Sequence, residues 1–273
     1  MREIKAKQIL LAIVELVRQA NFILRSDVLA ALKNAYRAEN NNQAKIILKA
    51  ILDNAVFAKK ESLAICQDTG MPVVFVEVGQ NIKIKGDLKS AINQGIEMSY
   101  KKYSLRNSIV ADPLLRKTPE FSPGIIHIDM VRGSKIKLTV LPKGFGCENK
   151  SQLKMFKPTA SLEEIKHFIV GAVKDAGPDA CPPYIVGVGI GGTADYASFL
   201  AKKALLSRIQ IRNSQLENDL LKDINKTGIG PMGLGGKTTA LAVKIQKYPT
   251  HIAGLAVSVN ISCHALRSAC VIL

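Results

Sequence analysis

Three cysteines that stand far apart in the sequence place the strongest constraint on how this chain can fold. They are Cys66, Cys181 and Cys263, and no two cysteines of the chain have a C-x-x-C spacing. A zinc ribbon and a ferredoxin-type run of ligands are therefore excluded. If folding brings the three thiolates together, they can hold an iron–sulfur cluster in which one iron has no protein ligand and is open to a substrate. The alternative is three packed thiols, because cysteine is among the most buried residue types.

Composition favours one compact domain over residues 1–273, with a helical N-terminal region over about 1–60. Hydrophobic residues make up 47% of the chain, which is enough for a sizeable core, and no linker-like tract separates two halves. No apolar run reaches the roughly 20 residues of a membrane span, and the first residues lack the pattern of a signal peptide. An odd count of five cysteines fits a reducing compartment, so we expect a cytoplasmic protein.

The formal net charge of +16 leaves two classes of partner to consider. The basic residues are spread along the chain and do not form a cluster interleaved with aromatic residues, which favours a solvated surface over a nucleic-acid interface. A basic nucleic-acid-binding protein with structural cysteines remains the distant alternative. A positive field would also attract an acidic small molecule or an acidic protein partner.

Hydrophobic periodicity predicts an α+β fold, with mixed β-sheets surrounded by helices. We expect helices near residues 3–20, 26–38, 42–59, 160–175, 194–206 and 238–246. We expect strands at 71–79, 184–190 and 252–259. The alternating runs 125–131 and 135–141, on either side of Arg132-Gly133-Ser134, are typical of a hairpin.

Two glycine-rich sequence motifs resemble nucleotide-binding loops. The first, at 187–192, fits G-x-G-x-x-G, but no clean strand with a terminal acidic residue follows it, so we interpret these glycines as points of close backbone approach. The second, before Lys237, has Pro231 where a phosphate-binding loop needs glycine, which breaks the cradle of amide donors. Lys237 and nearby amides can still meet an anion at a helix start.

Several longer sequence motifs occur in the same order as in the class I (iron–sulfur) fumarases. Through them the chain resembles this family over roughly residues 40–270. The motifs are Cys66-Gln67-Asp68-Thr69-Gly70, Lys143-Gly144-Phe145-Gly146-Cys147-Glu148-Asn149, Cys181-Pro182-Pro183, Gly187-Val188-Gly189-Ile190-Gly191-Gly192-Thr193, Gly230-Pro231-Met232-Gly233-Leu234-Gly235-Gly236-Lys237-Thr238-Thr239 and Thr250-His251-Ile252-Ala253. The chain resembles the alpha subunit of a two-subunit fumarate hydratase or of the related L-tartrate dehydratase. The resemblance implies a hydro-lyase that hydrates fumarate to malate reversibly, with L(+)-tartrate dehydration as the alternative.

The resemblance also implies a role for individual residues. Cys66, Cys181 and Cys263 match the ligands of a [4Fe-4S] cluster, whereas Cys147 and Cys270 do not. Asp68 and His251 match catalytic residues and are expected to form a proton-transferring pair. Gln67, Arg106, Gly144, Gly146 and Lys237 are expected at the substrate, with Arg106 gripping a carboxylate through two parallel hydrogen bonds. His264 is expected to support a cluster ligand.

The single-chain relatives continue into a further domain that this chain lacks. The resemblance therefore implies a separate beta subunit that carries the missing domain and completes the site. We expect a hetero-oligomer in which the present chain contributes the cluster and half of the substrate contacts.

Overall fold

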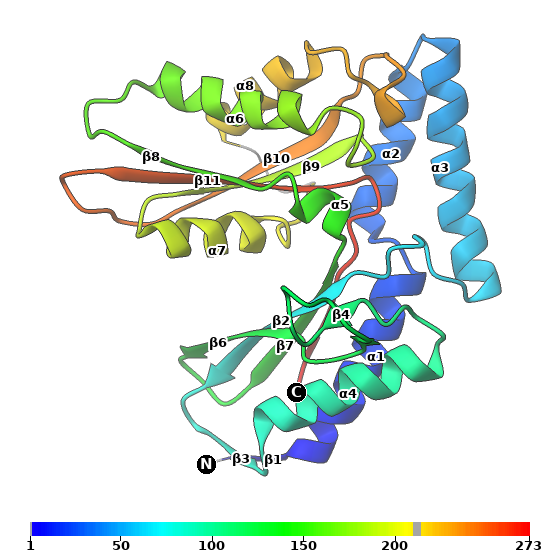
Figure 1. Ribbon diagram of the computed structural model, residues 1–273, viewed down its shortest axis with the longest axis vertical. Coiled ribbons are helices and arrows are strands. Elements are labelled where there is room, and N and C mark those ends of the chain that lie inside the picture. The colour runs from blue at the N-terminus through cyan, green and yellow to red at the C-terminus, as the bar shows by residue number, and fades with distance from the viewer. Residues whose placement is uncertain (1, 210–213) are drawn as a thin grey trace. The chain divides into compact units, whose positions relative to one another are not determined.

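The computed structural model describes residues 2–209 and 214–273, in which helices accompany mixed β-sheets (Figure 1). The helices are α1 (Ala6–Phe22), α2 (Ser26–Ala38), α3 (Asn42–Glu61), α4 (Leu88–Lys102), α5 (Phe145–Glu148), α6 (Leu162–Ala176), α7 (Ala194–Ala204), α8 (Gln215–Asn225) and the 3-10 turn η1 (Pro231–Gly233). The strands are β1 (Arg2–Lys5), β2 (Met71–Gly79), β3 (Ile82–Lys85), β4 (Ile109–Val110), β5 (Pro119–Glu120), β6 (Ile125–Val131), β7 (Ile136–Lys143), β8 (Gln152–Phe156), β9 (Tyr184–Ile190), β10 (Ala240–Lys247), β11 (Leu255–Ser262) and β12 (Ala269–Ile272). The predicted α+β class is confirmed, and the N-terminal region is helical as expected.

The chain divides into two compact units, each built from segments that are distant in sequence. Unit 1 comprises Met1–Arg25, Phe57–Phe145 and Arg267–Leu273, and unit 2 comprises Ser26–Val56 and Gly146–Leu266. That the two units together make the one catalytic domain expected over residues 1–273 stays a prediction.

The sheet of unit 1 has the strand order β12-β7-β2-β6. Strand β2 is antiparallel to β7 and parallel to β6, so it receives hydrogen bonds on both edges. Helices α1 and α4 pack against each other and share one apolar core with the sheet, to which the buried residues Ile13, Ile96, Val76 and Leu138 belong. The amphipathic N-terminal sequence therefore forms its helix by burying its apolar stripe on this sheet.

The sheet of unit 2 has the strand order β10-β9-β11-β8. Helices α6 and α8 cover one face, and α7 covers the other (Figure 1). Its central strand β9 runs parallel to β10 and antiparallel to β11. Because helices cover both faces of the sheet, side chains on both sides of β9 are buried, which explains its continuous apolar sequence.

Side-chain caps fix where α6 and α8 begin. The Ser161 hydroxyl accepts the Glu164 N–H at 3.2 Å, and the Glu164 carboxylate accepts the Ser161 N–H at 2.7 Å. Ser214 and Glu217 repeat this arrangement at the start of α8. Such reciprocal capping satisfies amides that a helix start leaves unpaired.

The predicted hairpin of residues 125–141 is wrong, although both of its strands exist. Strands β6 and β7 do not pair with each other, because β2 lies between them. The turn between them crosses the end of β2, where the N–H groups of Gly79, Gln80 and Asn81 donate to carbonyls at Lys135, Val131 and Gly133. These three backbone N–H groups supply hydrogen bonds to carbonyl groups of the turn. The end of β2 therefore holds the turn in place without hydrogen bonds between β6 and β7.

The helix predicted at 238–246 is also wrong, because Ala240–Lys247 forms strand β10. The strand pairs in parallel with β9, and Ala240, Ala242 and Val243 are buried in the core of unit 2. Alanine favours a helix in isolation, but the open edge of β9 offers backbone hydrogen bonds and burial that outweigh local propensity.

Glycines in β9 let α7 approach the sheet closely. A Cβ at Gly187 would lie 2.1 Å from the Ala201 carbonyl oxygen, and one at Gly189 would lie 2.0 Å from that of Ala197. These distances leave no room for a side chain, since the obstacle is helix backbone. The interpretation of Gly187 and Gly189 as points of close backbone approach is confirmed.

Among residues 2–209 and 214–273, no helix is both long enough and apolar enough to cross a membrane.

The contact of Gly189 with α7 predicts a large cost for adding a single methyl group. We expect Gly189→Ala to lower the free energy of unfolding by about 3 kcal/mol, because the backbone of α7 must move away. Gly171→Ala in α6 is the matched control, since its Cβ would meet nothing within 4 Å and alanine favours helix by about 0.5–1 kcal/mol. Thermal melting of both variants tests this, and equal melting temperatures would contradict the packing argument.

Candidate active site

The Cys66 loop, defined as residues 65–70, joins the end of α3 to β2 in unit 1. Cys66 and Asp68 are half-buried, Gln67 is exposed, and Thr69 is buried. The side chains of Cys66, Gln67 and Asp68 are therefore accessible at the surface of the unit, while the end of the loop at Thr69 is buried.

Tyr100 of α4 anchors the far end of the Cys66 loop. Its hydroxyl lies 3.0 Å from the carbonyl oxygen of Thr69 and 2.9 Å from that of Gly70. Burial raises the pKa of Tyr100, so the hydroxyl keeps its proton and acts as a donor. A buried donor placed between two carbonyls fixes the direction in which the chain leaves the loop.

Backbone amides orient the carboxylate of Asp68. One oxygen accepts the Gly70 N–H at 2.9 Å, and the other accepts the Phe145 N–H at 2.8 Å. Gly144 lies against this carboxylate, since a Cβ there would be 3.2 Å from Asp68 Oδ2. The backbone N–H that holds the Asp68 carboxylate from this segment is therefore that of Phe145. Gly146, the other glycine expected at the substrate, belongs to unit 2.

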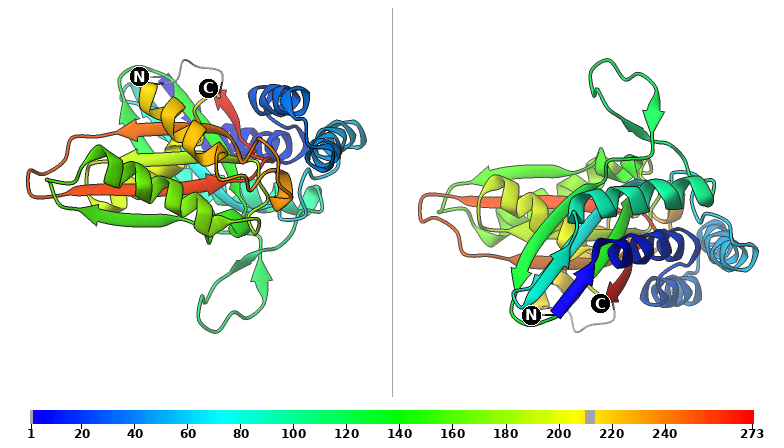
Figure 2. Two further views of the ribbon diagram at one scale, coloured as in Figure 1. Left: turned by 90° about the horizontal axis from the view of Figure 1, so that it is seen from above. Right: turned by 90° about the horizontal axis from the view of Figure 1, so that it is seen from below.

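Arg106 is fixed to the Cys66 loop through its own backbone. Its N–H donates to Thr69 Oγ1 at 3.0 Å, while its side chain is exposed. It stands at the base of an arm that carries the antiparallel pair β4-β5 and projects from unit 1 (Figure 2). Unit 1 therefore brings a cysteine, a carboxylate and a guanidinium-bearing residue to one loop.

Cys181 and Cys263 lie on neighbouring segments of unit 2. His264, the residue after Cys263, contacts the Cys181 carbonyl twice, through its backbone N–H at 3.4 Å and through its ring Nδ1 at 3.1 Å. Because a carbonyl only accepts, Nδ1 carries the ring proton. Both cysteines are half-buried.

Two further features shape the Cys181 segment. The buried Cys147 thiol donates to the Ala180 carbonyl at 3.3 Å, which is a supporting contact for the residue that precedes Cys181. Cys181 itself has a φ of 59°, in the left-handed region that residues other than glycine rarely adopt. Such conformations persist only where the surroundings enforce them, and they concentrate at functional sites.

The three candidate cluster ligands are divided between the units. Cys66 belongs to unit 1, and Cys181 and Cys263 belong to unit 2. Within the described residues, no three His, Cys, Asp or Glu side chains converge as a metal site. The donor chemistry nevertheless fits, since cysteine thiolates are the ligands of iron–sulfur clusters and each of the three has a half-buried sulfur-bearing side chain. Cys270, on β12, is exposed.

His251 lies in the turn between β10 and β11, at the opposite end of β11 from Cys263. The eight residues of this strand span about 25 Å, so unit 2 does not bring His251 to its two cysteines. The Ala253 N–H donates to His251 Nδ1 at 3.2 Å, which leaves the proton of the neutral ring on Nε2. The turn therefore presents an exposed Nε2–H donor.

The expected position of Lys237 at a helix start is wrong, because the segment that follows it forms strand β10. Lys237 instead contacts the end of α2. Its ammonium group donates to the Ala38 carbonyl at 3.1 Å, and its backbone N–H donates to the carboxylate of Glu39 at 2.7 Å. Burial raises the pKa of Glu39, but hydrogen bonds from the amides of Asn41, Lys237 and Asn40 outweigh this effect and leave the pKa below its ordinary value. An ionised Glu39 thus fixes the loop that carries Lys237.

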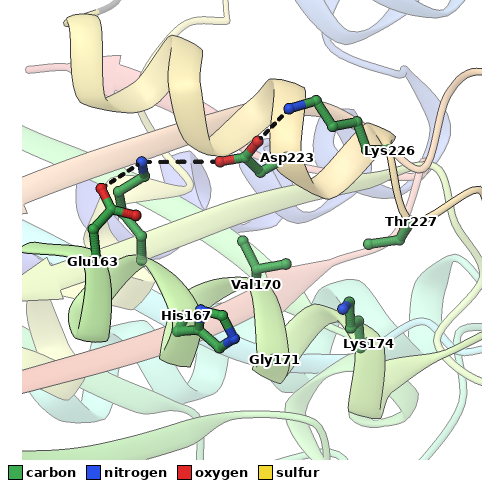
Figure 3. Close-up of a pocket in the computed structure, with 9 residues that line it drawn as sticks. Glu163, His167, Val170, Gly171, Lys174, Asp223, Lys226 and Thr227 are labelled. Atoms are coloured by element: carbon green, nitrogen blue, oxygen red, sulfur yellow. Dashed lines mark hydrogen bonds and ion pairs between the residues drawn. The ribbon is translucent and has the colours of Figure 1, made fainter.

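A cavity of about 480 Å³ lies between α6 and α8 on unit 2 (Figure 3). Lys166 pairs there with Glu163 at 3.0 Å and with Asp223 at 4.0 Å, and Lys226 pairs with Asp223 at 2.9 Å. Carboxylates thus neutralise two of its three lysines, and its lining contains none of the residues expected in the site. His167, for which the sequence offered no context, is one of its lining residues.

Sequence reasoning missed Tyr100 and Arg267, the buried side chains that hold the Cys66 loop. Tyr100 lies on the buried face of an ordinary amphipathic helix, which gives no signal of a polar task. Arg267 follows Cys263 by four positions, and this closeness to a candidate ligand was the one available indication.

Comparison with known proteins places the whole chain in one family. The profile of the family Fumarate hydratase (Fumerase) matches residues 11–272. The "Putative L(+)-tartrate dehydratase subunit alpha" of Methanocaldococcus jannaschii is 42% identical over 270 residues, which cover 94% of each chain. The "L(+)-tartrate dehydratase subunit alpha" of Escherichia coli is 31% identical in strain UTI89 and 30% in strain K12, in both over 88% of this chain and 82% of the relative. Because these matches run along nearly its full length, the chain belongs to the fumarate hydratase (Fumerase) family and is a hydro-lyase.

Proposed function

We propose that this chain is the alpha subunit of an iron–sulfur hydro-lyase that hydrates fumarate to malate reversibly. The observation that supports this most is the Cys66 loop, which carries an oriented Asp68 carboxylate and is bonded to the backbone of Arg106. A dicarboxylate needs a cation at one end and a proton-transferring group at the carbon that gains or loses a proton. The loop provides both beside a cysteine.

Dehydration of L(+)-tartrate is the second candidate, because the relatives above are named for it. Malate and tartrate share their two carboxylates, and tartrate carries one more hydroxyl group. The same cluster and the same Arg106 would serve either substrate, so groups beside that hydroxyl decide the preference.

We assign a [4Fe-4S] cluster to Cys66, Cys181 and Cys263. When bound, such a cluster supplies a Lewis-acidic iron that makes a hydroxyl a better leaving group. The chain's own task is to hold the three thiolates, with the Cys181 carbonyl fixed by His264 and the Cys66 loop fixed by Tyr100.

The remaining residues have separate tasks in this proposal. Arg106 binds one substrate carboxylate through paired N–H groups, and exposed Gln67 donates to the same substrate. Asp68 accepts the carbon-bound proton on a carboxylate oxygen and returns it in the reverse direction. Gly144 keeps the space beside Asp68 clear, because any side chain there would press on the carboxylate.

His251, Gly146 and Lys237 complete the proposed set from unit 2. His251 Nε2–H is proposed as a donor to the Asp68 carboxylate or to the substrate, and because β11 separates His251 from Cys263 by about 25 Å, this donor has to come from another copy of the chain in the hetero-oligomer. An ammonium group has three donors, of which Lys237 gives one to Ala38, so it can also meet an anion. The Gly146 amide contributes a neutral donor.

A separate beta subunit is the proposed partner. The relatives above are all named as alpha subunits, and the net charge of +16 favours association with an acidic surface. Enclosing a small dicarboxylate requires groups on both sides of it.

Replacing each cysteine with serine tests the ligand assignment. We expect Cys66→Ser, Cys181→Ser and Cys263→Ser to lose the cluster, because a hydroxyl is a poor ligand for iron. Cys147→Ser and Cys270→Ser are matched controls that should retain iron and sulfide after anaerobic reconstitution. Normal iron content in any of the first three variants would refute the assignment.

Arg106→Lys tests the proposed carboxylate clamp. The substitution keeps the charge but removes the paired geometry, so kcat/KM should fall by at least tenfold, or about 1.4 kcal/mol. Arg132→Lys, in the exposed turn between β6 and β7, is the control. If steady-state kinetics place the Arg106 variant within twofold of the unmodified enzyme, Arg106 does not bind the substrate.

Dependence on a partner tests the function as a whole. The anaerobically reconstituted chain should bind iron but show little turnover alone, and it should gain at least a hundredfold in activity when co-purified with its beta subunit. Fumarate hydration and L(+)-tartrate dehydration would be measured side by side. Substantial turnover by the isolated chain would rule out the half-site, and a preference for tartrate would select the second candidate.

A further inference from the structure

Arg267 is a buried cation directly beneath the Cys66 loop. It is 3% exposed and belongs to the last segment of unit 1, between Leu266 and β12. Its Nη2 donates to the Asp68 carbonyl oxygen at 2.7 Å, and its Nη1 donates to Asn21 Oδ1 at 3.3 Å. The side chain therefore connects helix α1 to the loop that carries Cys66 and Asp68.

The guanidinium of Arg267 is buried although, among the described residues, it forms no ion pair. Its Nε is buried without a hydrogen-bond partner, and burial of an unpaired charge is unfavourable. A methionine or leucine of similar volume would avoid this cost but could not donate to Asp68 and Asn21. The hydrogen-bond donors of the guanidinium are therefore what this position uses.

The position of Arg267 indicates what that use is. A Cβ at Gly144 would lie 3.2 Å from Asp68 Oδ2 and 3.9 Å from Arg267 Nη2, so carboxylate and guanidinium both face Gly144. The shortest hydrogen bond of Arg267 goes to the backbone carbonyl of the same Asp68. The guanidinium thus holds the main chain of the loop at the residue that carries the carboxylate.

The other anchors of the loop act on its two ends. Asn21 accepts the Ile65 N–H on its backbone carbonyl at 2.9 Å, and Tyr100 bonds the carbonyls of Thr69 and Gly70. Arg267 acts between them, at Asp68. Along the sequence Arg267 follows Cys263 by four residues, a stretch that spans at most about 14 Å, so its anchor is also close along the chain to a second candidate ligand.

We propose that Arg267 is a positioning residue for the hydro-lyase reaction, which fixes the main chain at Asp68 and thereby sets the direction of the Cys66 and Asp68 side chains. The inference deepens the proposed function and rests on it for the roles of Cys66 and Asp68. Arg267 contacts neither the substrate nor the cluster ligands in this assignment. It acts through Asp68.

Hydrogen exchange in the full-length, metal-free chain tests the positioning directly. In Arg267→Lys, a single ammonium replaces the fork that reaches both acceptors, so amides of residues 65–70 should exchange at least tenfold faster, while those of β9 and β11 keep their rates. Arg132→Lys is the matched control and should leave the loop within twofold. Unchanged exchange of the loop in a folded Arg267→Lys chain overturns the proposal.

Kinetics of the reconstituted complex separate positioning from general stability. Fumarate turnover by Arg267→Lys with the beta subunit should show kcat reduced at least tenfold and KM changed less than threefold at equal iron content, because the substrate clamp is intact and the proton-transferring carboxylate is misplaced. A KM effect with normal kcat overturns the proposal.

A second variant decides the matter if Arg267→Lys does not fold. Asn21→Ser removes the Nη1 acceptor but keeps the backbone carbonyl that holds Ile65, so loop exchange should rise at least threefold, and a wild-type rate would overturn the proposal. Iron in the unmodified chain is measured separately. A chain that binds no iron but shows the exchange effect would refute the cluster and leave the positioning role of Arg267 intact.

Discussion

The Cys66 loop depends on hydrogen bonds from buried side chains, because its carbonyl groups lie outside any helix or sheet ladder. The Tyr100 hydroxyl donates to the carbonyl oxygens of Thr69 and Gly70, and the Arg267 guanidinium donates to that of Asp68. A buried carbonyl without a partner would cost about 1–3 kcal/mol, so each of these donors is needed for the loop to exist in this shape. The side chains of Cys66 and Asp68 take their directions from this shape.

The same principle governs the Cys181 segment of unit 2. The thiol of Cys147 satisfies the Ala180 carbonyl, and His264 satisfies that of Cys181. Both cysteine-bearing segments are thus irregular chain whose carbonyl groups accept hydrogen bonds from side chains. Irregular backbone can point a sulfur in a direction that a regular strand or helix does not allow, and rigid neighbours keep that direction constant.

Sequence patterns gave the fold class and most of the helices, because long amphipathic stretches such as 6–22 and 42–61 carry a strong periodic signal. They failed at Ala240–Lys247 and at the pairing of β6 with β7, where the outcome depends on which strand edge is open in the folded unit. Local sequence contains no information about that edge.

In the candidate site, too, some residues could be identified from local sequence and others only from the folded structure. The sequence motifs around Cys66, Cys181 and His251 could be recognised. The structure adds that Arg106 and Gly144 lie at the Cys66 loop, which a sequence match alone could not show. Tyr100 and Arg267 could not be identified in advance, because their contacts join residues separated by 31 and 199 positions. Only folding shows that such side chains end beneath a loop.

The interruption of unit 1 by unit 2 has a consequence for the order of events on the ribosome. Arg267 and strand β12 belong to unit 1 but emerge only after the whole of Gly146–Leu266 has been made, a delay on the order of ten seconds at common synthesis rates. During that interval β7 has no β12 beside it, and Asp68 has no guanidinium on its carbonyl. The Cys66 loop therefore reaches its final shape only once unit 2 has been synthesised, so the side chains of Cys66 and Asp68 take their final directions later than a segment so early in the sequence would suggest.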